Sequence, residues 1–338
     1  MTAPLSYWHD SLVPGDDGSP RAPLRGGVDA DVAIVGAGFT GLWTAYYLRR
    51  ADPSLRVVVL ERETAGFGAS GRNGGWCIGD PSGPAPAVER TRGAGAAEAM
   101  ARAMHRTVDE VGSVIERERI DCGWAKAGAV IVARNAGQLA RLRHRQSLAE
   151  RYGYGDAWTM LDREQTMRVV QVAGAVGAQT TPHAAALHPA RLARGLACAV
   201  ERHGCGICEQ TTVRSIEGCR VRTDHGTVHG EVVVRATEAY SVSIRGHERT
   251  ILPLGNYVVA TEPIAAGTPG VGSTHCATSA SHTTGVACSA CHATCFPASA
   301  TTPRPVRRGP VATSAKASLP PTPRAARSPT SSAGSTAT

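Results

Sequence analysis

The chain carries the sequence DVAIVGAGFTGLWTA at residues 31–45. It begins with a short apolar run that predicts a buried strand, and a segment with helical spacing of apolar residues follows the glycines. In a strand-turn-helix unit of this kind, Gly36 permits the tight turn and Gly38 lets the backbone approach a pyrophosphate. Gly41 allows the helix to pack closely on the strand. The stretch therefore predicts a dinucleotide-binding unit.

A second predicted strand strengthens this interpretation. It covers residues 57–60 and leads into Glu61, which lies 20 residues after Gly41. A carboxylate in that position accepts hydrogen bonds from the hydroxyls of an adenosine ribose. The backbone N–H groups of Phe39 and Thr40, at the start of the helix, are predicted to bind the pyrophosphate. Together these features predict an α/β fold with a parallel sheet.

Two further features indicate which dinucleotide binds. Arg62 is suited to a 2′-phosphate, but Glu61 beside it would repel that group, which argues against NADP. A second glycine-rich segment, GFGASGRNGG at residues 66–75, follows the second strand. Its backbone N–H groups, Ser70 and Asn73 are placed to contact a cofactor beyond the pyrophosphate. An extended flavin needs such a loop, so FAD is favoured; an NAD-dependent dehydrogenase is the alternative.

These segments resemble the family of FAD-dependent amine and D-amino-acid oxidases, in particular its γ-glutamylputrescine oxidoreductase branch. The likeness spans about residues 5–265 and is carried by residues 31–48, 57–75, 121–133, 187–213 and 232–263. It implies that Arg72 and Gly74 lie beside the flavin, in the second glycine-rich loop. It also implies that Val213 lies at the adenine and that Thr237 belongs to a later cofactor turn.

The resemblance implies oxidation of the C–N bond of a small amine or amino acid. A hydride passes to the flavin, water hydrolyses the imine, and oxygen reoxidises the cofactor. We name no catalytic residue, because the family's ring-facing residues fall where the pattern is lost, and we expect no metal ion. A truncated, non-catalytic remnant is the second alternative. The predicted cofactor-binding residues are Gly36, Gly38, Phe39, Thr40, Gly41, Glu61, Arg62, Ser70, Arg72, Asn73, Gly74, Val213 and Thr237.

The expected architecture is a Rossmann-type FAD-binding domain interleaved with a substrate domain built on a mixed sheet. The FAD-binding domain is expected at residues 1–80 and 189–250, and the substrate domain at residues 81–188 and 251–267. Helices are predicted at residues 39–50, 93–119, 136–152 and 189–203, and further strands at residues 129–133, 211–216, 220–223, 231–236 and 257–261.

Residues 268–338 differ in composition from the rest. They are rich in Ala, Ser, Thr and Pro, lack Asp and Glu, and show no periodicity, so we expect a disordered tail. Such a composition is typical of a shifted reading frame in GC-rich coding, and our hypothesis is a frameshift near residues 264–268. Residues 288–292 match the CxxCH pattern of haem attachment, or with Cys295 a zinc knuckle. We favour chance enrichment of Cys and His.

The net charge of +8 comes largely from this tail, which holds five Arg and one Lys. The first 267 residues carry 30 basic and 28 acidic side chains, so we expect no nucleic-acid or membrane partner. Residues 1–10 lack the features of a signal peptide, and a run of about 18 apolar residues is missing. We therefore expect a cytoplasmic protein with reduced thiols, and leave its oligomeric state open.

Some candidate groups have plainer explanations. Cys205 and Cys208 form a CxxC at a predicted helix-to-strand turn, where structural thiols are favoured over a redox or zinc site. His183 and His188 are candidate acid/base groups. His188 precedes Pro189, however, and is better explained as the residue that begins a helix.

Overall fold

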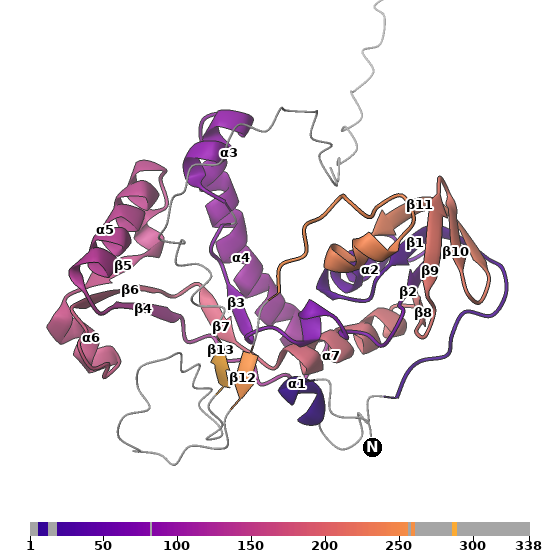
Figure 1. Ribbon diagram of the computed structural model, residues 1–338, viewed down its shortest axis with the longest axis horizontal. Helices are drawn as coiled ribbons and strands as arrows, with labels where there is room; N and C mark the ends of the chain where they lie inside the picture. The colour runs from indigo at the N-terminus through magenta and orange to yellow at the C-terminus, as the bar shows by residue number, and fades with distance from the viewer. Residues whose placement is uncertain (1–5, 13–18, 82, 256–257, 261–285, 289–338) are drawn as a thin grey trace, which may run out of the picture. The chain divides into compact units, whose positions relative to one another are not determined.

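The computed structural model describes residues 6–12, 19–81, 83–255, 258–260 and 286–288. Its largest sheet has six strands, which are β1 (Val28–Val35), β2 (Val57–Leu60), β8 (Gly206–Cys208), β9 (Val213–Glu217), β10 (Arg220–Thr223) and β11 (Thr227–Arg235). Their spatial order is β8-β2-β1-β11-β10-β9 (Figure 1). Strands β8, β2, β1 and β11 run parallel to one another. Strand β10 is antiparallel to β11, and β9 is antiparallel to β10. The predicted α/β class with a parallel sheet is confirmed.

Side chains of β1 alternate between two apolar layers. Register places Ile34 between Val59 of β2 and Val234 of β11. Ile34 enters the cluster beneath the helices, whereas Ala33 and Val35 enter a second cluster on the opposite face. Successive side chains of a strand point to opposite faces. Residues 32–35 of β1, which are covered on both faces, are accordingly all apolar.

Two helices, α2 (Phe39–Ala51) and α7 (Pro189–Arg202), pack side by side against the first of these layers (Figure 1). Leu192, Leu196 and Val200 of α7 are each at most 3% exposed and follow one another at a spacing of four residues. That spacing places them on one face of the helix, which is the face buried against the sheet.

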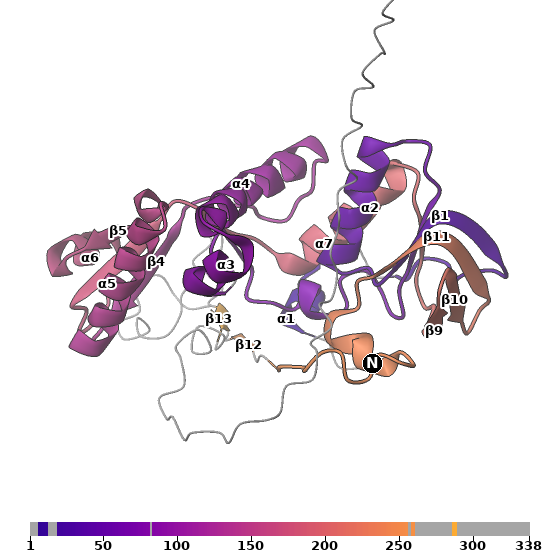
Figure 2. The same ribbon diagram turned by 90° about the horizontal axis from the view of Figure 1, so that it is seen from above.

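Residues 81–188 form a separate antiparallel sheet of three strands in the order β4-β6-β5. Helix α5 contacts all three strands (Figure 2). A two-stranded sheet of β3 and β7 pairs a strand that precedes this region with one near its end. The bounds are β3 (Trp76–Ile78), α3 (Ala85–Arg92), α4 (Ala96–Arg117), β4 (Ala129–Ala133), α5 (Ala136–Arg151), η2 (Gly155–Ala157), β5 (Thr159–Leu161), α6 (Arg163–Val169), β6 (Gly177–Thr181) and β7 (Ala184–Ala186).

The predicted elements agree in position with the observed ones, with small shifts at their ends. The helix expected at residues 93–119 is α4, preceded by the shorter α3, and β11 begins four residues before the expected strand at 231–236. Within the described ranges, no helix is both long and apolar enough to cross a membrane.

The described residues after position 255 belong to two short strands. β12 (Val258–Ala260) pairs antiparallel with β13 (Val286–Cys288). β13 belongs to the segment 268–338, for which we expected no ordered structure. The rest of that segment, including the Cys and His positions after Cys288 in the CxxCH pattern, lies outside the described residues, as does the expected frameshift point.

Candidate cofactor site

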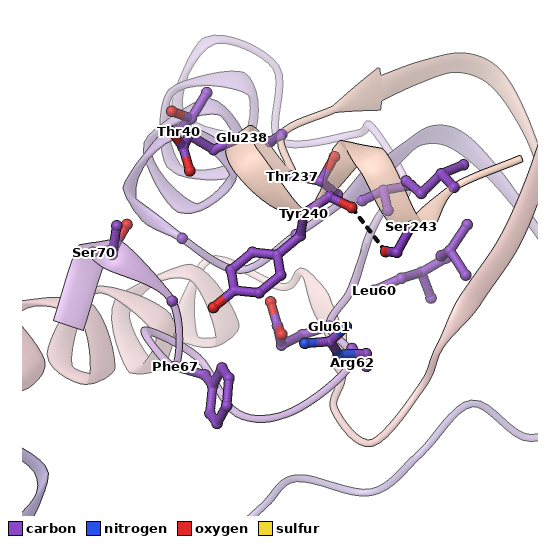
Figure 3. Close-up of a pocket in the computed structure, with 18 of the residues that line it drawn as sticks. Thr40, Leu60, Glu61, Arg62, Phe67, Ser70, Thr237, Glu238, Tyr240 and Ser243 are labelled. Carbon is purple, nitrogen blue, oxygen red and sulfur yellow. Dashed lines mark hydrogen bonds between the residues drawn. The ribbon is translucent and has the colours of Figure 1, made fainter. Parts of the chain in front are cut away.

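A pocket with a cavity volume of about 150 Å³, partly open to solvent, lies at the carboxyl ends of β1, β2 and β11 (Figure 3). The turn between β1 and α2, the end of β2 and residues 67–70 form part of its wall. Residues 211–213 and the short helix η3 (Glu238–Ser243) form the rest. Ligands of open α/β sheets bind at the carboxyl ends of the strands, so the fold itself favours this location.

Close backbone contacts require glycine at Gly36, in the turn after β1, and at Gly41, in the first turn of α2. Gly36 has a φ of +105°, and a Cβ there would lie 2.5 Å from the carbonyl oxygen of Ala236. A Cβ on Gly41 would lie 1.9 Å from the carbonyl oxygen of Gly36. Gly41 therefore lets α2 approach the turn closely, although it does not line the pocket itself.

The start of α2 lines the pocket through Gly38, Phe39 and Thr40. The N–H of Phe39 donates to Ser70 Oγ at 2.8 Å, and Ser70 lies on the short helix η1 (Ala69–Gly71). The first N–H groups of a helix have no partner within it, and they carry the positive end of the helix dipole. Thr40 and its neighbours thus offer a site for an anion. A Cβ on Gly38 would lie 2.9 Å from Ser70 Oγ, so a side chain there would enter the same space.

Glu61 lies deep in the pocket (Figure 3). Its Oε2 accepts a hydrogen bond from the N–H of Ala37 at 2.8 Å, and its Oε1 accepts one from the N–H of Glu63 at 3.0 Å. Burial raises the pKa of Glu61, and the nearby carboxylate of Glu209 adds to this. A carboxylate oxygen can accept two hydrogen bonds, so each Glu61 oxygen retains an acceptor position for a ligand hydroxyl.

Aromatic rings and guanidinium groups form the outer wall. Tyr240 of η3 points into the pocket between Ser70 and Phe67 (Figure 3). Arg72 Nη2 donates to the Tyr240 hydroxyl at 2.8 Å, and the Arg72 guanidinium lies 4.9 Å from the centre of the Phe67 ring. Arg62 lies 5.0 Å from the centre of the Tyr240 ring. Both pairs are cation–π contacts. The hydrogen bond from Arg72 to Tyr240 links the second glycine-rich loop to η3, and the Arg62–Tyr240 contact links the end of β2 to η3.

The structure brings most of the predicted residues to one place. Those that line the pocket are Gly36, Gly38, Phe39, Thr40, Glu61, Arg62, Ser70, Val213 and Thr237. The predicted Gly41, Arg72, Asn73 and Gly74 are not among the residues that line it. Asn73 shapes the loop, because its Nδ2 donates to the carbonyl of Ser70 at 2.9 Å and its Oδ1 accepts from the N–H of Gly75 at 2.8 Å.

Sequence reasoning missed several lining residues, among them Phe67, Thr211, Tyr240 and Ser243. Tyr240 lies three residues after the predicted Thr237, but its spacing did not show that its ring would reach Gly68. Among the other candidates, the side chain of His188 caps the start of α7, as predicted. Cys205 is a buried free thiol whose pKa burial raises to about 11.

The pocket fits the ADP half of a dinucleotide. Gly36 and Gly38 keep the turn open, the start of α2 faces the same space, and Glu61 offers carboxylate oxygens as acceptors. Fold and pocket together define a dinucleotide-binding protein of the Rossmann class. The chain belongs to the DAO family of FAD dependent oxidoreductases, whose family model matches residues 31–304. The cofactor is therefore FAD. This match continues past Ile264, where we expected the likeness to end.

The chain is similar to known proteins in sequence and in fold. It is 33% identical over 253 residues to the γ-glutamylputrescine oxidoreductase of Escherichia coli, covering 73% of this chain and 58% of that protein. L-proline dehydrogenase from P. horikoshii has a similar fold, with a TM-score of 0.58 at 19% identity over 72% of this chain and 63% of the other. Glycine oxidase from Geobacillus kaustophilus gives 0.53 at 22% identity, over 69% and 60%. The chain spans about three fifths of the length of the curated relatives it matches.

Proposed function

We propose that the protein is an oxidoreductase that uses FAD to oxidise the C–N bond of an amine or amino acid. The observation that carries the proposal is the pocket at the strand ends, in which the start of α2 and Glu61 face the same space. Membership of the DAO family supports the flavin. The similarity to a γ-glutamylputrescine oxidoreductase supports an amine substrate.

Each part of the pocket has a proposed role in holding FAD. The N–H groups at the start of α2, near Thr40, bind the pyrophosphate, since they are free of partners within the helix. Glu61 accepts the ribose hydroxyls, and Val213 lies against the adenine. Ser70, which already bonds to the start of α2, sets the path of the cofactor toward its ring.

The environment of Arg62 supports FAD over NADP. Its Nε donates to Glu63 Oε1 at 3.2 Å, and its guanidinium lies on Tyr240. A guanidinium held by a carboxylate and an aromatic ring is less available for a 2′-phosphate. Glu61 beside it disfavours that phosphate further, by charge repulsion.

The start of α2 and Glu61 would hold FAD, which would supply a hydride acceptor for the carbon next to nitrogen. Water would hydrolyse the resulting imine, and oxygen is the proposed final acceptor. The protein's own residues orient the cofactor and shape the space around it. We assign no acid/base group among the described residues.

We also propose the domain division predicted from the sequence. The six-stranded sheet takes its strands from residues 1–80 and 189–250, and the β4-β6-β5 sheet lies wholly within residues 81–188. This arrangement supports a cofactor domain and a substrate domain that alternate along the chain. The pair of β3 and β7 joins the two regions.

The visible spectrum of the purified full-length chain tests the function. We expect flavin absorption bands, a released cofactor with the mass of FAD, and bleaching of the bands under anaerobic conditions by amines such as γ-glutamylputrescine. Recovery of the bands on admitting oxygen tests the acceptor. A colourless chain that takes up no added FAD would overturn the proposal. A flavin that binds but never bleaches across amines and amino acids would indicate the non-catalytic alternative.

A further inference from the structure

We propose that residues 6–11 form a brace that positions the second glycine-rich loop for the cofactor, with Trp8 as the positioning residue. This rests on the proposed FAD site. The brace contains the short helix α1 (Tyr7–Asp10), which packs against α7. Its partners Asn73 and His188 lie 65 and 177 positions away in the sequence.

Trp8 holds the loop through its indole nitrogen. Trp8 Nε1 donates to the carbonyl oxygen of Asn73 at 2.8 Å. The Trp8 ring packs against Gly75, where an added Cβ would lie 3.4 Å from the ring. The His9 ring packs against Gly71, where an added Cβ would lie 3.3 Å from that ring. The brace therefore contacts the loop at every second residue from Gly71 to Gly75, and the absence of side chains on the two glycines makes that approach possible.

A chain of hydrogen bonds leads from Trp8 to the pocket. Asn73 receives the indole N–H on its carbonyl, and its side-chain amide donates to the carbonyl of Ser70 at 2.9 Å. Ser70 Oγ in turn accepts the N–H of Phe39 at the start of α2. Movement of Trp8 would thus be transmitted to the side chain of Ser70, which lines the pocket.

The other side of the brace rests on His188. The Trp8 and His188 rings meet edge to face with centroids 4.8 Å apart. His188 Nδ1 accepts the N–H of Arg191 at 3.2 Å, so the proton of the neutral ring is on Nε2, which donates to Ser11 Oγ at 3.1 Å. Burial and the charge of Arg191 lower the pKa of His188 to about 4, which keeps the ring neutral near pH 7. Both His188 nitrogens are used, which fixes the ring against which Trp8 packs.

The loop needs such support because glycine is frequent in it. Residues 66–75 contain five glycines, and glycine loses more backbone freedom on ordering than any other residue. If the brace orders the loop before the cofactor arrives, the entropic cost of ordering the loop is not subtracted from the binding free energy of FAD. The brace is thus expected to act on cofactor affinity more than on the stability of the sheet.

Two readouts on the full-length chain test the brace. The first is the dissociation constant of FAD for the deflavinated protein. Trp8→Phe keeps the aromatic packing and removes the N–H, and we expect FAD binding about 3- to 10-fold weaker, as for the loss of one hydrogen bond. The second is the rate of trypsin cleavage after Arg72 in the cofactor-free chain, followed by mass spectrometry. We expect it to rise by a similar factor.

Two further variants make the test specific. His188→Asn keeps a residue suited to capping α7 and removes the ring against which Trp8 packs. Its effect combined with Trp8→Phe should be smaller than the sum, because both act on one contact. Trp158→Phe is the matched control, because it makes the same change away from the brace. The Trp158 ring centre lies 3.9 Å from Arg145 Cζ, within residues 81–188.

The outcomes separate the brace from the proposed function. If the wild type binds no FAD, the function fails, and the cleavage rate after Arg72 still judges the brace. If Trp8→Phe leaves both FAD affinity and that cleavage rate equal to those of Trp158→Phe, the brace is refuted.

Discussion

The carboxylate of Glu118 gives a stability prediction that can be worked out from the structure. Glu118 follows α4 directly, and its side chain is 9% exposed. Its Oε1 contacts the Tyr46 hydroxyl at 2.9 Å and His203 Nε2 at 3.0 Å. Its Oε2 accepts from Arg202 Nη2 at 3.0 Å. One carboxylate thus connects α4 to both helices that cover the large sheet.

Burial by itself would raise the pKa of Glu118, but the hydrogen bonds from these partners outweigh it and lower the pKa to about 2. A carboxyl pKa that is lower in the folded than in the unfolded state stabilises the fold above the unfolded value. That stabilisation is lost as the pH falls through the folded value. A lowering of the pKa from 4.5 to about 2 contributes at most about 3 kcal/mol to the free energy of unfolding at pH 7. The value is an upper bound because Arg202 is half exposed, and solvent screens its attraction to the carboxylate.

The assay is urea unfolding of the wild type and of Glu118→Gln from pH 7 down to pH 3. We expect the variant to have a free energy of unfolding about 2–3 kcal/mol lower at pH 7, because the amide lacks the charge that its partners stabilise. About 1 kcal/mol of this difference should be gone at pH 4, and more than half at pH 3. Glu116→Gln, exposed on the same helix, is the matched control. A difference from that control below about 0.5 kcal/mol, or one independent of pH, would refute the reasoning.

Three other substitutions have expected outcomes. Gly38→Ala brings a methyl group 2.9 Å from Ser70 Oγ and should weaken FAD binding about tenfold or more, measured by flavin fluorescence, with little change in thermal stability. Ser70→Ala leaves the N–H of Phe39 without its acceptor and should lower the free energy of unfolding by about 1 kcal/mol in urea, while weakening FAD binding. Arg21→Met removes the guanidinium that lies 2.9 Å from the fully buried Glu209 carboxylate, and calorimetry should show a loss of about 3–5 kcal/mol; an unchanged melting temperature would contradict this.

The cofactor turn could be predicted because its requirements are local. The left-handed φ of Gly36, the close approach at Gly41 and the free N–H groups of α2 all arise within about ten residues of chain. The apolar run of β1 likewise indicated a strand covered on both faces. Glu61 was found through its fixed distance from the turn, because the crossover helix between two parallel strands sets that distance.

The remaining contacts of the site could not be predicted. Tyr240 reaches Arg72 across 168 positions, and Trp8 reaches Asn73 across 65. Nothing in the spacing of either pair encodes the contact. The buried Glu209 was missed for the same reason, because its partner Arg21 lies 188 positions away and an isolated Glu in a sequence indicates a surface position.

The sequence by itself determined the α/β class, the dinucleotide turn and the likeness to a flavoenzyme family, since backbone geometry and hydrophobic period act over short stretches of chain. Only the tertiary structure decided which side chains close the pocket, how the N-terminal residues support the glycine-rich loop and which carboxylates are buried. Those features depend on segments that meet only after the sheet has brought them together, and burial and hydrogen bonding between such segments are properties of the folded chain.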